Sequence, residues 1–417
     1  MNQIIGLISK KKKNKKINLP TSKSILIRLL FMLLFSKKKV VIERVSICSD
    51  VFSMISCLEC LGKKIAYKNS SLIIKNDVKE RKKKEIFVGN SGLTARIIFM
   101  YLLFKKKKII LKGDKGIYKR PMKSIEDIYN NVLKKNRSRV LYKRDGFLPL
   151  KTFHGSLFFN IKEKTSSQFI TAFLLNSHIL KRKIEINIGN VVSKKYISMT
   201  IEILKKFGLK IKKKGKNSYN FKKSKLRFSK KYIVEKDCSS ASYFFMLCLI
   251  EKNIFFPKKI ISKTQTEVKF LNVLNKIGLN ILKNKNRIFL RFKRKKVNSI
   301  SIDCESIIDS SISLCLLFLS GIKKIKLYNI HNWNVKESKR IDAISKECKV
   351  FGMNVKKGIN WIIFTTFKER SNIVIKNYDD HRICMTFSIL LKKKNILINN
   401  PNSVKKTFPR FFDELNV

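Results

Sequence analysis

Apolar residues along this chain fall into helix-length stretches that end at a glycine, and each stretch is followed by a short strand flanked by lysines. In the first copy, Leu58–Gly62 closes a helix and Lys63–Tyr67 follows as a strand. The later copies are Leu204–Gly208 before Leu209–Lys213, Leu274–Gly278 before Leu279–Lys283, and Ser345–Gly352 before Met353–Lys357, and one at Val132–Asn136 before Arg137–Tyr142 ends in asparagine. Glycine and asparagine both tolerate the left-handed conformation that ends many helices.

These helix ends recur at nearly constant spacing. They lie at positions 62, 136, 208, 278 and 352, so the intervals are 74, 72, 70 and 74 residues. A sixth end is expected just past the last residue, after the helical segment Phe408–Asn416. The spacing predicts an α/β protein of six similar units, arranged as two domains of three units, with the middle boundary near Tyr232–Asp237.

The composition supports a protein with large cores. Of 417 residues, 44% are hydrophobic, and no apolar run reaches the ~18–20 residues of a membrane span. The longest runs are Ile25–Phe35, which Arg28 interrupts, and Ile312–Ser320. No small-residue cleavage site follows Phe35, which argues against a signal peptide. The nine scattered cysteines are typical of reduced thiols, so we expect a cytoplasmic protein.

The formal net charge is +65, which usually indicates nucleic acid or an anionic membrane as a partner. Here, however, lysine runs are spread along the whole chain, for example at Lys10–Lys13, Lys105–Lys108 and Lys392–Lys394. Glycine, proline and alanine are scarce at the same time, which indicates a general compositional bias. We therefore expect no specific nucleic-acid partner, only weak polyanion binding that follows from charge.

Three segments have the residues of an anion site at the start of a helix. Leu19–Ser24 precedes an apolar helix that carries Arg28, Gly89–Arg96 contains two glycines before a helix, and Thr165–Gln168 offers three hydroxyls and an amide. Backbone N–H groups at a helix start bind phosphate well. A capped helix or a tight turn explains each segment equally well when it is taken alone.

Other polar segments carry candidate acids and bases. Asp309 precedes an apolar helix, where it is either a helix cap or a functional carboxylate. Glu337 lies among Lys336, Lys339 and Arg340, as in a surface ion cluster or an acid/base site beside anion ligands. The four histidines, including His381, lack metal-ligand spacing. Cys57 and Cys60 lie inside an apolar helix and are interpreted as helix core.

These segments, in this order, resemble the motifs of the EPSP synthase (3-phosphoshikimate 1-carboxyvinyltransferase) family. The matching blocks are INLPTSKS with Arg28, GNSGLTAR, Arg120-Pro121, SSQFITAFLL, SKKYISMT at Ser193–Thr200, DCSSASYF at Asp237–Phe244, Asp309, NWNVKESKR, YDDHR and KTFPRFFDEL. They extend from Ile17 to Leu415, so the resemblance covers nearly the whole chain. It implies two domains, each of three βαβαββ units around a pseudo-threefold axis. The expected domains are 21–235, and 1–20 with 236–417, with the active site in the cleft between them.

The resemblance also implies ligands for each substrate. The residues expected at 3-phosphoshikimate are Lys23, Ser24, Arg28, Ser166, Ser167, Gln168, Ser193, Tyr196, Asp309, Asn332 and Lys336. Those expected at phosphoenolpyruvate are Lys23, Gly92, Arg120, Gln168, Arg340, Arg382 and Lys406. In the family pattern Asp309 accepts the proton of the 5-hydroxyl, Glu337 protonates the methylene carbon, and Lys23 assists catalysis.

The activity implied is transfer of the enolpyruvyl group of phosphoenolpyruvate to 3-phosphoshikimate, a step of chorismate and aromatic amino acid synthesis. No cofactor or metal is expected, because the cations of such a site can stabilise the developing charge. We expect a monomer with no membrane partner. Two alternatives are an enolpyruvyl transferase acting on a UDP-amino sugar, and a decayed enzyme whose basic surface binds RNA.

Overall fold

The computed structural model describes most of the chain, with short gaps. The described residues are 4–5, 15–76, 84–105, 107–122, 140–144, 147–152, 167–180, 184–187, 194–215, 218–222, 224–251, 254–257, 264–283, 287–293, 295–368, 370, 372–392 and 396–416. The chain forms two compact units. We call Thr21–Val234 the N-terminal unit, and Met1–Pro20 with Glu235–Val417 the C-terminal unit.

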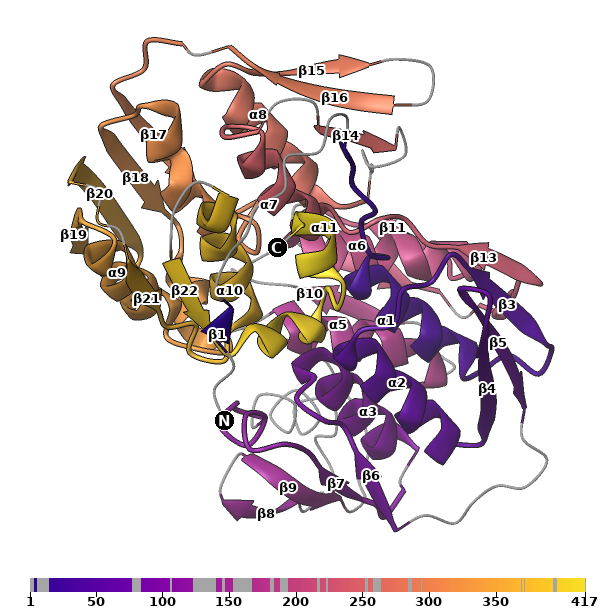
Figure 1. The fold of residues 1–417 in the computed structure, drawn as a ribbon. Helices are drawn as coiled ribbons and strands as arrows, with labels where there is room; N and C mark the ends of the chain where they lie inside the picture. Colours follow the sequence, from indigo (N-terminus) through magenta and orange to yellow (C-terminus); the bar gives the residue numbers. More distant parts are fainter. Residues whose placement is uncertain are drawn as a thin grey trace. The chain divides into compact units, whose positions relative to one another are not determined.

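The described part of the N-terminal unit contains three small sheets and the helices that pack on them (Figure 1). Its helices are α1 (Lys23–Leu33), α2 (Ser49–Cys60), α3 (Gly92–Phe104), α5 (Ser167–Asn176), the 3₁₀ turn η1 (Ser177–Leu180) and α6 (Lys194–Lys206). Its strands are β3 (Val40–Glu43), β4 (Lys63–Lys68), β5 (Ser71–Asn76), β6 (Glu85–Phe87), β7 (Ile110–Lys112), β8 (Val140–Arg144), β9 (Phe147–Thr152), β10 (Ile184–Asn187), β11 (Ile211–Lys213), β12 (Ser218–Phe221) and β13 (Lys231–Ile233).

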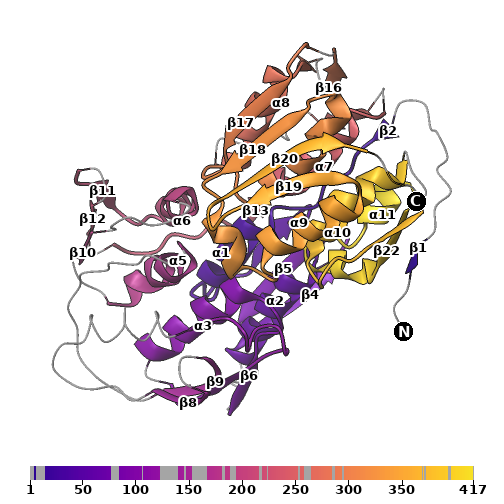
Figure 2. The same ribbon diagram turned by 90° about the vertical axis from the view of Figure 1, so that its left-hand side faces the viewer.

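The C-terminal unit also has three sheets among its described residues (Figure 2). Its strands are β1 (Ile4–Ile5), β2 (Lys15–Lys16), β14 (Ile254–Pro257), β15 (Leu279–Lys283), β16 (Arg287–Phe292), β17 (Ser299–Asp303), β18 (Lys324–Tyr328), β19 (Met353–Lys357), β20 (Trp361–Phe367), β21 (Ile373–Ile375) and β22 (Ile396–Asn399). Its helices are α7 (Cys238–Leu247), η3 (Thr266–Lys269), α8 (Phe270–Lys276), η4 (Ser311–Ser320), η5 (His331–Val335), α9 (Arg340–Val350), α10 (His381–Ser388), η6 (Ile389–Lys392), η7 (Pro401–Lys406) and α11 (Phe411–Leu415).

One strand pattern recurs in both units. In the sheet β6-β7-β9-β8, the first two strands are parallel and the remaining neighbours are antiparallel. The sheet β17-β18-β20-β19 has the same pairing. In each case a buried helix connects the parallel pair, α3 in the first sheet and η4 in the second. This is the repeating α/β unit that the spacing of helix ends predicts.

Three sheets are completed by strands from distant parts of the sequence. β13 lies parallel to β3, β2 lies parallel to β14, and β1 pairs antiparallel with β22. In Figure 1 the indigo strand β1 lies beside the yellow strand β22. The first residues of the chain therefore belong structurally to the C-terminal unit.

The first helix of each repeating α/β unit is almost wholly buried. In α3 and α7 nearly every residue is buried, and α5 and α10 are similar. A helix that is apolar on all sides is expected in a core. The second helices, such as α2 and α9, bury one side only. The candidate motifs precede or begin the buried helices, so these helices hold them in place.

The predicted helix ends are confirmed wherever the structure describes them. Gly62, Gly208, Gly278 and Gly352 all have left-handed backbone, with φ of 92°, 84°, 104° and 102°. The copy ending at Asn136 lies outside the described residues. A sixth left-handed end is found at Asn416 (φ 56°), whereas the spacing placed it beyond the last residue.

Two local expectations need correction. The apolar segment after Asp309 is a 3₁₀-helix, η4, rather than an α-helix. The serine and threonine before α1 do not cap it through their side chains, because Thr21 Oγ1 donates to the carbonyl of Arg44 and accepts from the N–H of Ser46. Within the described ranges, no helix has the length and apolar character that crossing a bilayer requires.

Candidate active site

Arg340 is the centre of a buried charge cluster in the C-terminal unit. Its side chain is 1% exposed, and it grips Asp380 with two donors, Nε to Oδ2 at 2.7 Å and Nη2 to Oδ1 at 3.2 Å. Nη2 also donates to Glu337 Oε2 at 2.8 Å. Burial lowers the pKa of this guanidinium, but Asp380 and Glu337 together outweigh burial and raise the pKa. Arg340 is therefore a fixed positive charge held by two carboxylates.

Asp309 faces three cations. Its Oδ1 lies 3.4 Å from Lys336 Nζ and 3.7 Å from Arg340 Nη1, and its Oδ2 lies 3.5 Å from Arg382 Nη2. A tight ion pair would have these atoms about 2.7–2.9 Å apart. The N-cap of η4 is Ser310, and no side chain caps that helix. The cap interpretation of Asp309 is thus wrong.

Glu337 and Lys336 occupy the segment between η5 and α9. Glu337 Oε1 lies 3.7 Å from Lys406 Nζ, at the end of η7, while its other oxygen accepts from Arg340. Burial lowers the pKa of Lys336, and Asp309 partly opposes this. Asn332 on η5, four residues before Lys336, is also buried. The interpretation of Glu337 as part of an exposed surface cluster does not hold, because its side chain is only 12% exposed.

A strained turn sets the position of Asp380. Tyr378 and Asp379 both have left-handed backbone, with φ of 55° and 56°, a conformation that costs a side-chain-bearing residue about 1 kcal/mol or more. Asn377 holds the turn by donating to the carbonyls of Asn399 and Asn400 and accepting from the N–H of Asp379. Asp380 then caps α10 by accepting from the N–H of Arg382. Such strain is common at functional sites.

Tyr378 is also held from α9. Its hydroxyl donates to Glu347 Oε1 at 2.6 Å, and the second oxygen of Glu347 accepts from the N–H of Lys376. Glu347 is buried. Burial and this hydrogen bond raise the pKa of the Tyr378 hydroxyl. The turn is therefore braced on both sides.

Tyr243 supports Arg382 from the buried helix α7. Arg382 Nη1 donates to the Tyr243 hydroxyl at 3.3 Å. Burial raises the pKa of this tyrosine, although Arg382 opposes the shift. The hydroxyl is a neutral acceptor, so this contact positions Arg382 without adding a negative charge. The other end of the guanidinium, Nη2, lies 3.5 Å from Asp309 Oδ2.

Lys23 and Arg28, five residues apart on α1, have different surroundings in the N-terminal unit. Lys23 Nζ pairs with Asp50 Oδ2 on α2 at 2.8 Å, and both side chains keep some exposure. Arg28 is buried and donates to Thr200 Oγ1, Thr171 Oγ1 and the carbonyl of Ser24. Burial lowers the pKa of Arg28 to about 10, which still leaves it charged at neutral pH. Its guanidinium also lies 5.9 Å from the ring centre of Tyr196.

Gly92 marks a second cationic group in this unit. A Cβ added there would lie 2.8 Å from Nη1 of both Arg120 and Arg96, and 3.4 Å from Gln168 Oε1. The missing side chain therefore lets two guanidinium groups and an amide converge on the start of α3. Ser167, which begins α5 beside Gln168, is buried.

Arg96 connects three candidate segments. Its Nη1 donates to the carbonyl of Gly92 and to Gln168 Oε1, and its Nη2 donates to the carbonyl of Pro121, the residue after Arg120. It also lies 4.5 Å from the ring centre of Phe169. One buried side chain thus fixes the start of α3, the start of α5 and the loop after β7.

The predicted residues form groups within each unit. Asp309, Lys336, Glu337, Arg340, Arg382 and Lys406 are brought together in the C-terminal unit. Gly92, Arg120 and Gln168 meet in the N-terminal unit, as do Ser24, Arg28 and Tyr196. Two predicted ligands, Ser166 and Ser193, lie outside the described residues.

Four partners were missed by the sequence reasoning: Asp50, Arg96, Tyr243 and Asp380. Asp380, Tyr243 and Arg96 stand inside recognised motif blocks, which is a signal that could have singled them out. Asp50 stands outside every block, in a segment with no distinguishing pattern. Its role is visible only because α2 packs against α1.

The charge balance of the C-terminal cluster favours an anionic ligand. Four cations (Lys336, Arg340, Arg382 and Lys406) meet three carboxylates (Asp309, Glu337 and Asp380), which leaves one positive charge over. Asp380 accepts hydrogen bonds from Arg340 and Ser338. Planar guanidinium groups bind carboxylates and phosphates well. Among described residues, no group of three His, Cys, Asp or Glu side chains is arranged to hold a metal.

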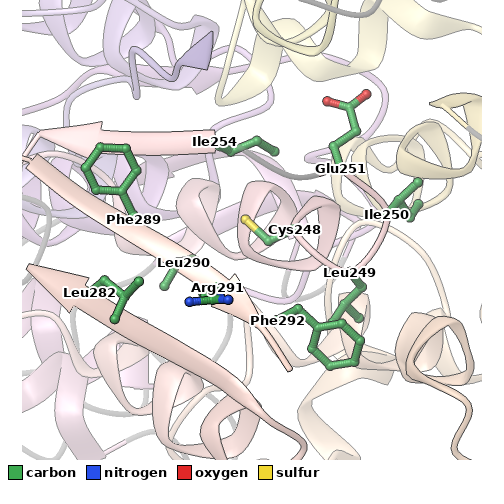
Figure 3. Close-up of a pocket in the computed structure, with 10 residues that line it drawn as sticks. All are labelled: Cys248, Leu249, Ile250, Glu251, Ile254, Leu282, Phe289, Leu290, Arg291 and Phe292. Atoms are coloured by element: carbon green, nitrogen blue, oxygen red, sulfur yellow. The ribbon is translucent and has the colours of Figure 1, made fainter. Parts of the chain in front are cut away.

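A pocket of about 540 Å³ lies elsewhere in the C-terminal unit (Figure 3). It is bounded by the end of α7 and by β14, β15 and β16, and its lining includes the apolar Leu282 and Phe289 and the charged Arg291 and Glu251. None of its lining residues is a predicted site residue. Nothing in its lining matches the dense cations of the two groups above, so we do not assign the reaction to it.

Comparison with known sequences gives a consistent result. Residues 8–415 match the sequence model of the family described as EPSP synthase (3-phosphoshikimate 1-carboxyvinyltransferase). A 3-phosphoshikimate 1-carboxyvinyltransferase of Buchnera aphidicola subsp. Cinara cedri is 33% identical over 413 residues, covering 95% of this chain and 93% of the relative. The enzyme of the same name from Vibrio vulnificus is 29% identical over 420 residues, covering 97% and 96%.

Solved structures confirm the predicted fold. An EPSP synthase from Acinetobacter baumannii matches with a TM-score of 0.79 at 20% identity, over 100% of this chain and 98% of that one. The enolpyruvyl transferase NikO from Streptomyces tendae matches with a TM-score of 0.76 at 9% identity, over 100% and 97%.

Proposed function

Because the chain belongs to the EPSP synthase (3-phosphoshikimate 1-carboxyvinyltransferase) family, we propose that it transfers the enolpyruvyl group of phosphoenolpyruvate to the 5-hydroxyl of 3-phosphoshikimate and releases phosphate. The observation that carries this proposal is the cluster around Arg340. It combines two carboxylates suited to proton transfer, Asp309 and Glu337, with cations suited to an anionic substrate. The UDP-amino-sugar and RNA-binding alternatives gain no support from the relatives.

Phosphoenolpyruvate carries a carboxylate and a phosphate, and both need cations. We assign the carboxylate to Arg340 and Arg382, whose guanidinium groups are fixed by Asp380 and by Tyr243. We assign the phosphate to Lys23, Arg120 and Lys406. Gly92 and Gln168 complete the set, since Arg120 and the Gln168 amide converge on the space beside Gly92 that a side chain would fill.

For 3-phosphoshikimate we assign two groups of ligands. Ser24, Arg28, Ser167, Gln168 and Tyr196 serve its phosphate and ring in the N-terminal unit, together with Ser166 and Ser193. Asp309, Asn332 and Lys336 serve the ring hydroxyls, and Lys23 is a further ligand of this substrate. The buried hydroxyl at Ser167 adds a donor without adding charge.

The chemistry needs an acid and a base in separate places. Glu337 delivers a proton to the methylene carbon while Asp309 accepts the proton of the 5-hydroxyl, whose oxygen bonds to the central carbon. Loss of a proton from the new methyl group and departure of phosphate then restore the double bond. Cations beside Glu337 favour its ionised form. Binding of an anionic substrate neutralises these cations and so favours the protonated acid.

We further place the enzyme in the cytoplasm as a monomer. All nine cysteines are free thiols, and eight are buried. Burial raises the pKa of Cys48 to about 11 and that of Cys304 to about 12, so these thiols are unreactive. Reduced, inert cysteines suit a reducing compartment.

The test is phosphate release from phosphoenolpyruvate by the full chain. Release is expected only when 3-phosphoshikimate is added, with equal appearance of the enolpyruvyl ether detected by mass spectrometry. A parallel reaction with a UDP-amino sugar in its place is the control. Release with the UDP-amino sugar and not with 3-phosphoshikimate would refute the assignment.

A further inference from the structure

The sheet β17-β18-β20-β19 has one face packed on the core and one face open to solvent. Ile302, Ile325, Leu327, Ile362 and Phe364 are buried on the inner side. Because side chains alternate along a strand, the residues between them point outward. Figure 2 shows the four orange strands side by side. We call the outward positions of these strands the outer face.

The outer face combines an aromatic pair with lysines. Tyr328 on β18 lies directly opposite Trp361 on β20, and both are partly exposed. The neighbouring row of the ladder places Lys326 opposite Ile363, which in turn lies opposite Lys356 on β19. The next row places Lys324 opposite Thr365. All three lysines are exposed.

Further side chains on this face are small, polar or apolar, with one acid. Ser299 and Ser301 on β17 lie beside Lys324 and Lys326, and Asp303 lies beside Tyr328. Ile359, in the turn between β19 and β20, is 84% exposed. The ring of Trp361 rests near Gly358, where an added Cβ would lie 2.6 Å from its Nε1. A side chain at position 358 would therefore collide with the tryptophan ring, which remains partly exposed.

We propose that the outer face of the sheet β17-β18-β20-β19 binds single-stranded nucleic acid without base specificity. Bases would stack on the partly exposed rings of Tyr328 and Trp361, and the lysines on β18 and β19 would contact the phosphates. The two lysines on β18 are about 7 Å apart, and Lys356 lies about 10 Å from Lys326 across β20. This activity is separate from the proposed reaction, since no residue of the outer face belongs to the candidate active site.

The chain itself supplies a matched control surface. The sheet containing β4 and β5, in the N-terminal unit, also carries three exposed outward lysines, Lys64, Lys68 and Lys75. Between the lysines of those strands stand Ala66 and Ile73 instead of aromatic rings. If binding depended on charge alone, the two surfaces would bind nucleic acid equally well. If bases stack on the aromatic rings, only the outer face should bind it well.

The experiment follows binding of a fluorescently labelled 20-residue oligouridine by anisotropy, and tryptophan emission in parallel. Of the two tryptophans, Trp333 is fully buried, so quenching reports on Trp361. We expect quenching on binding and about tenfold weaker binding for Trp361→Ala. The triple variant Lys324→Gln, Lys326→Gln, Lys356→Gln should flatten the slope of log affinity against log salt by about 2. The triple variant Lys64→Gln, Lys68→Gln, Lys75→Gln should leave that slope nearly unchanged.

Retained phosphate release and unchanged circular dichroism establish that each variant is folded. Equal losses in the two triple variants would overturn the proposal, because they would mean that binding follows net charge alone. Absence of tryptophan quenching would also overturn it. Vesicles of phosphatidylserine and phosphatidylcholine are tested in parallel. Tighter binding to vesicles than to the oligonucleotide, lost in the outer-face triple variant, would assign the surface to membranes instead.

Discussion

At the scale of single residues, the carboxylates of the candidate site differ in how closely they are held. Asp380 accepts hydrogen bonds from Arg340, Ser338 and the N–H of Arg382. Asp309 lies 3.4–3.7 Å from three cations, and Glu337 lies 2.8 Å from Arg340 and 3.7 Å from Lys406. A carboxylate in proton transfer needs an oxygen that can leave its partners. We expect Asp309 and Glu337 to act in proton transfer and Asp380 to act as a positioning group.

Loss of either carboxylate should therefore slow turnover. We expect Glu337→Gln and Asp309→Ala each to lower kcat by at least about 100-fold, the usual size of general acid–base terms. Glu337→Gln keeps a carbonyl oxygen for Arg340, so its effect should fall on kcat more than on KM. The control is Asp342→Asn, an exposed acid of α9 paired with Lys357. A near-normal kcat in either test variant would remove that residue from the mechanism.

Arg96 offers a second test at this scale. Arg96→Lys keeps the charge but loses the planar fork that reaches Gly92, Gln168 and Pro121 together. We expect KM for phosphoenolpyruvate to rise about tenfold, with little change in KM for 3-phosphoshikimate. Arg28→Lys, on α1 of the same unit, is the counterpart and should act on 3-phosphoshikimate instead. If Arg96→Lys changed KM for both substrates equally, the role of Arg96 would be to stabilise the fold in general.

His178 predicts a pH dependence of stability. Burial lowers its pKa from 6.5 to about 4, with Leu175 and Lys105 as minor influences, and its ring packs edge-on against Phe35 at 4.3 Å. Between these two pH values the unfolded chain binds the proton and the folded protein does not, so stability falls as pH drops from about 6.5 to about 4. The loss attributable to His178 is at most about 3 kcal/mol. His178→Phe should remove it.

The measurement compares urea midpoints of wild type and His178→Phe at pH 7 and pH 4.5. The exposed His331, changed to Gln, is the control. We expect the two test proteins to differ in their pH dependence and the control to match wild type. An identical pH dependence in all three would show that His178 stays accessible to protons in the folded protein.

At the scale of elements, the left-handed helix ends differ in how tightly they are packed. A Cβ at Gly278 would lie 1.9 Å from the carbonyl oxygen of Lys293, and one at Gly352 would lie 1.9 Å from that of Lys368. At Gly62 nothing lies within 4 Å. The first two glycines therefore serve both the left-handed φ and close backbone contact, whereas Gly62 serves φ alone.

Substitution by alanine should separate these two reasons. Gly62→Ala is expected to cost about 1 kcal/mol, the usual penalty for alanine at positive φ. Gly278→Ala should cost at least about 2 kcal/mol more, because a backbone carbonyl must move. The test compares the thermal unfolding midpoints of the two variants. Equal shifts of the midpoint would show that the loop at Lys293 moves at little energetic cost.

At the scale of the whole molecule, the charge of +65 opposes compaction. Exposed like charges repel one another over about 10 Å at 0.1 M salt, and less as salt increases. We expect the thermal midpoint to rise by several degrees between about 20 mM and 500 mM sodium chloride. Potassium chloride at the same concentrations should act equally, because screening does not depend on the cation. A midpoint that stays constant would mean that repulsion is not a major term.

The sequence by itself determined the features that depend on neighbouring residues. Helix ends at Gly62, Gly208, Gly278 and Gly352 were predictable, because few residues accept left-handed backbone. The candidate ligands came from the resemblance of motif blocks to the EPSP synthase family, and their roles stay predictions. The 3₁₀ form of η4 was not predictable, because periodicity separates it poorly from an α-helix.

Only the tertiary structure decided which distant groups meet. The pairing of β2 with β14 joins segments more than 200 residues apart. Strand β2 consists of two lysines, and no local pattern there predicts the pairing. The partners of the site residues are likewise distant in sequence, and only the tertiary structure shows them. Asp50 reaches Lys23, and Tyr243 reaches Arg382, through the packing of separate helices. The physical reason is that local sterics fix backbone conformation, whereas the contacts that hold and orient a charge depend on how whole elements pack.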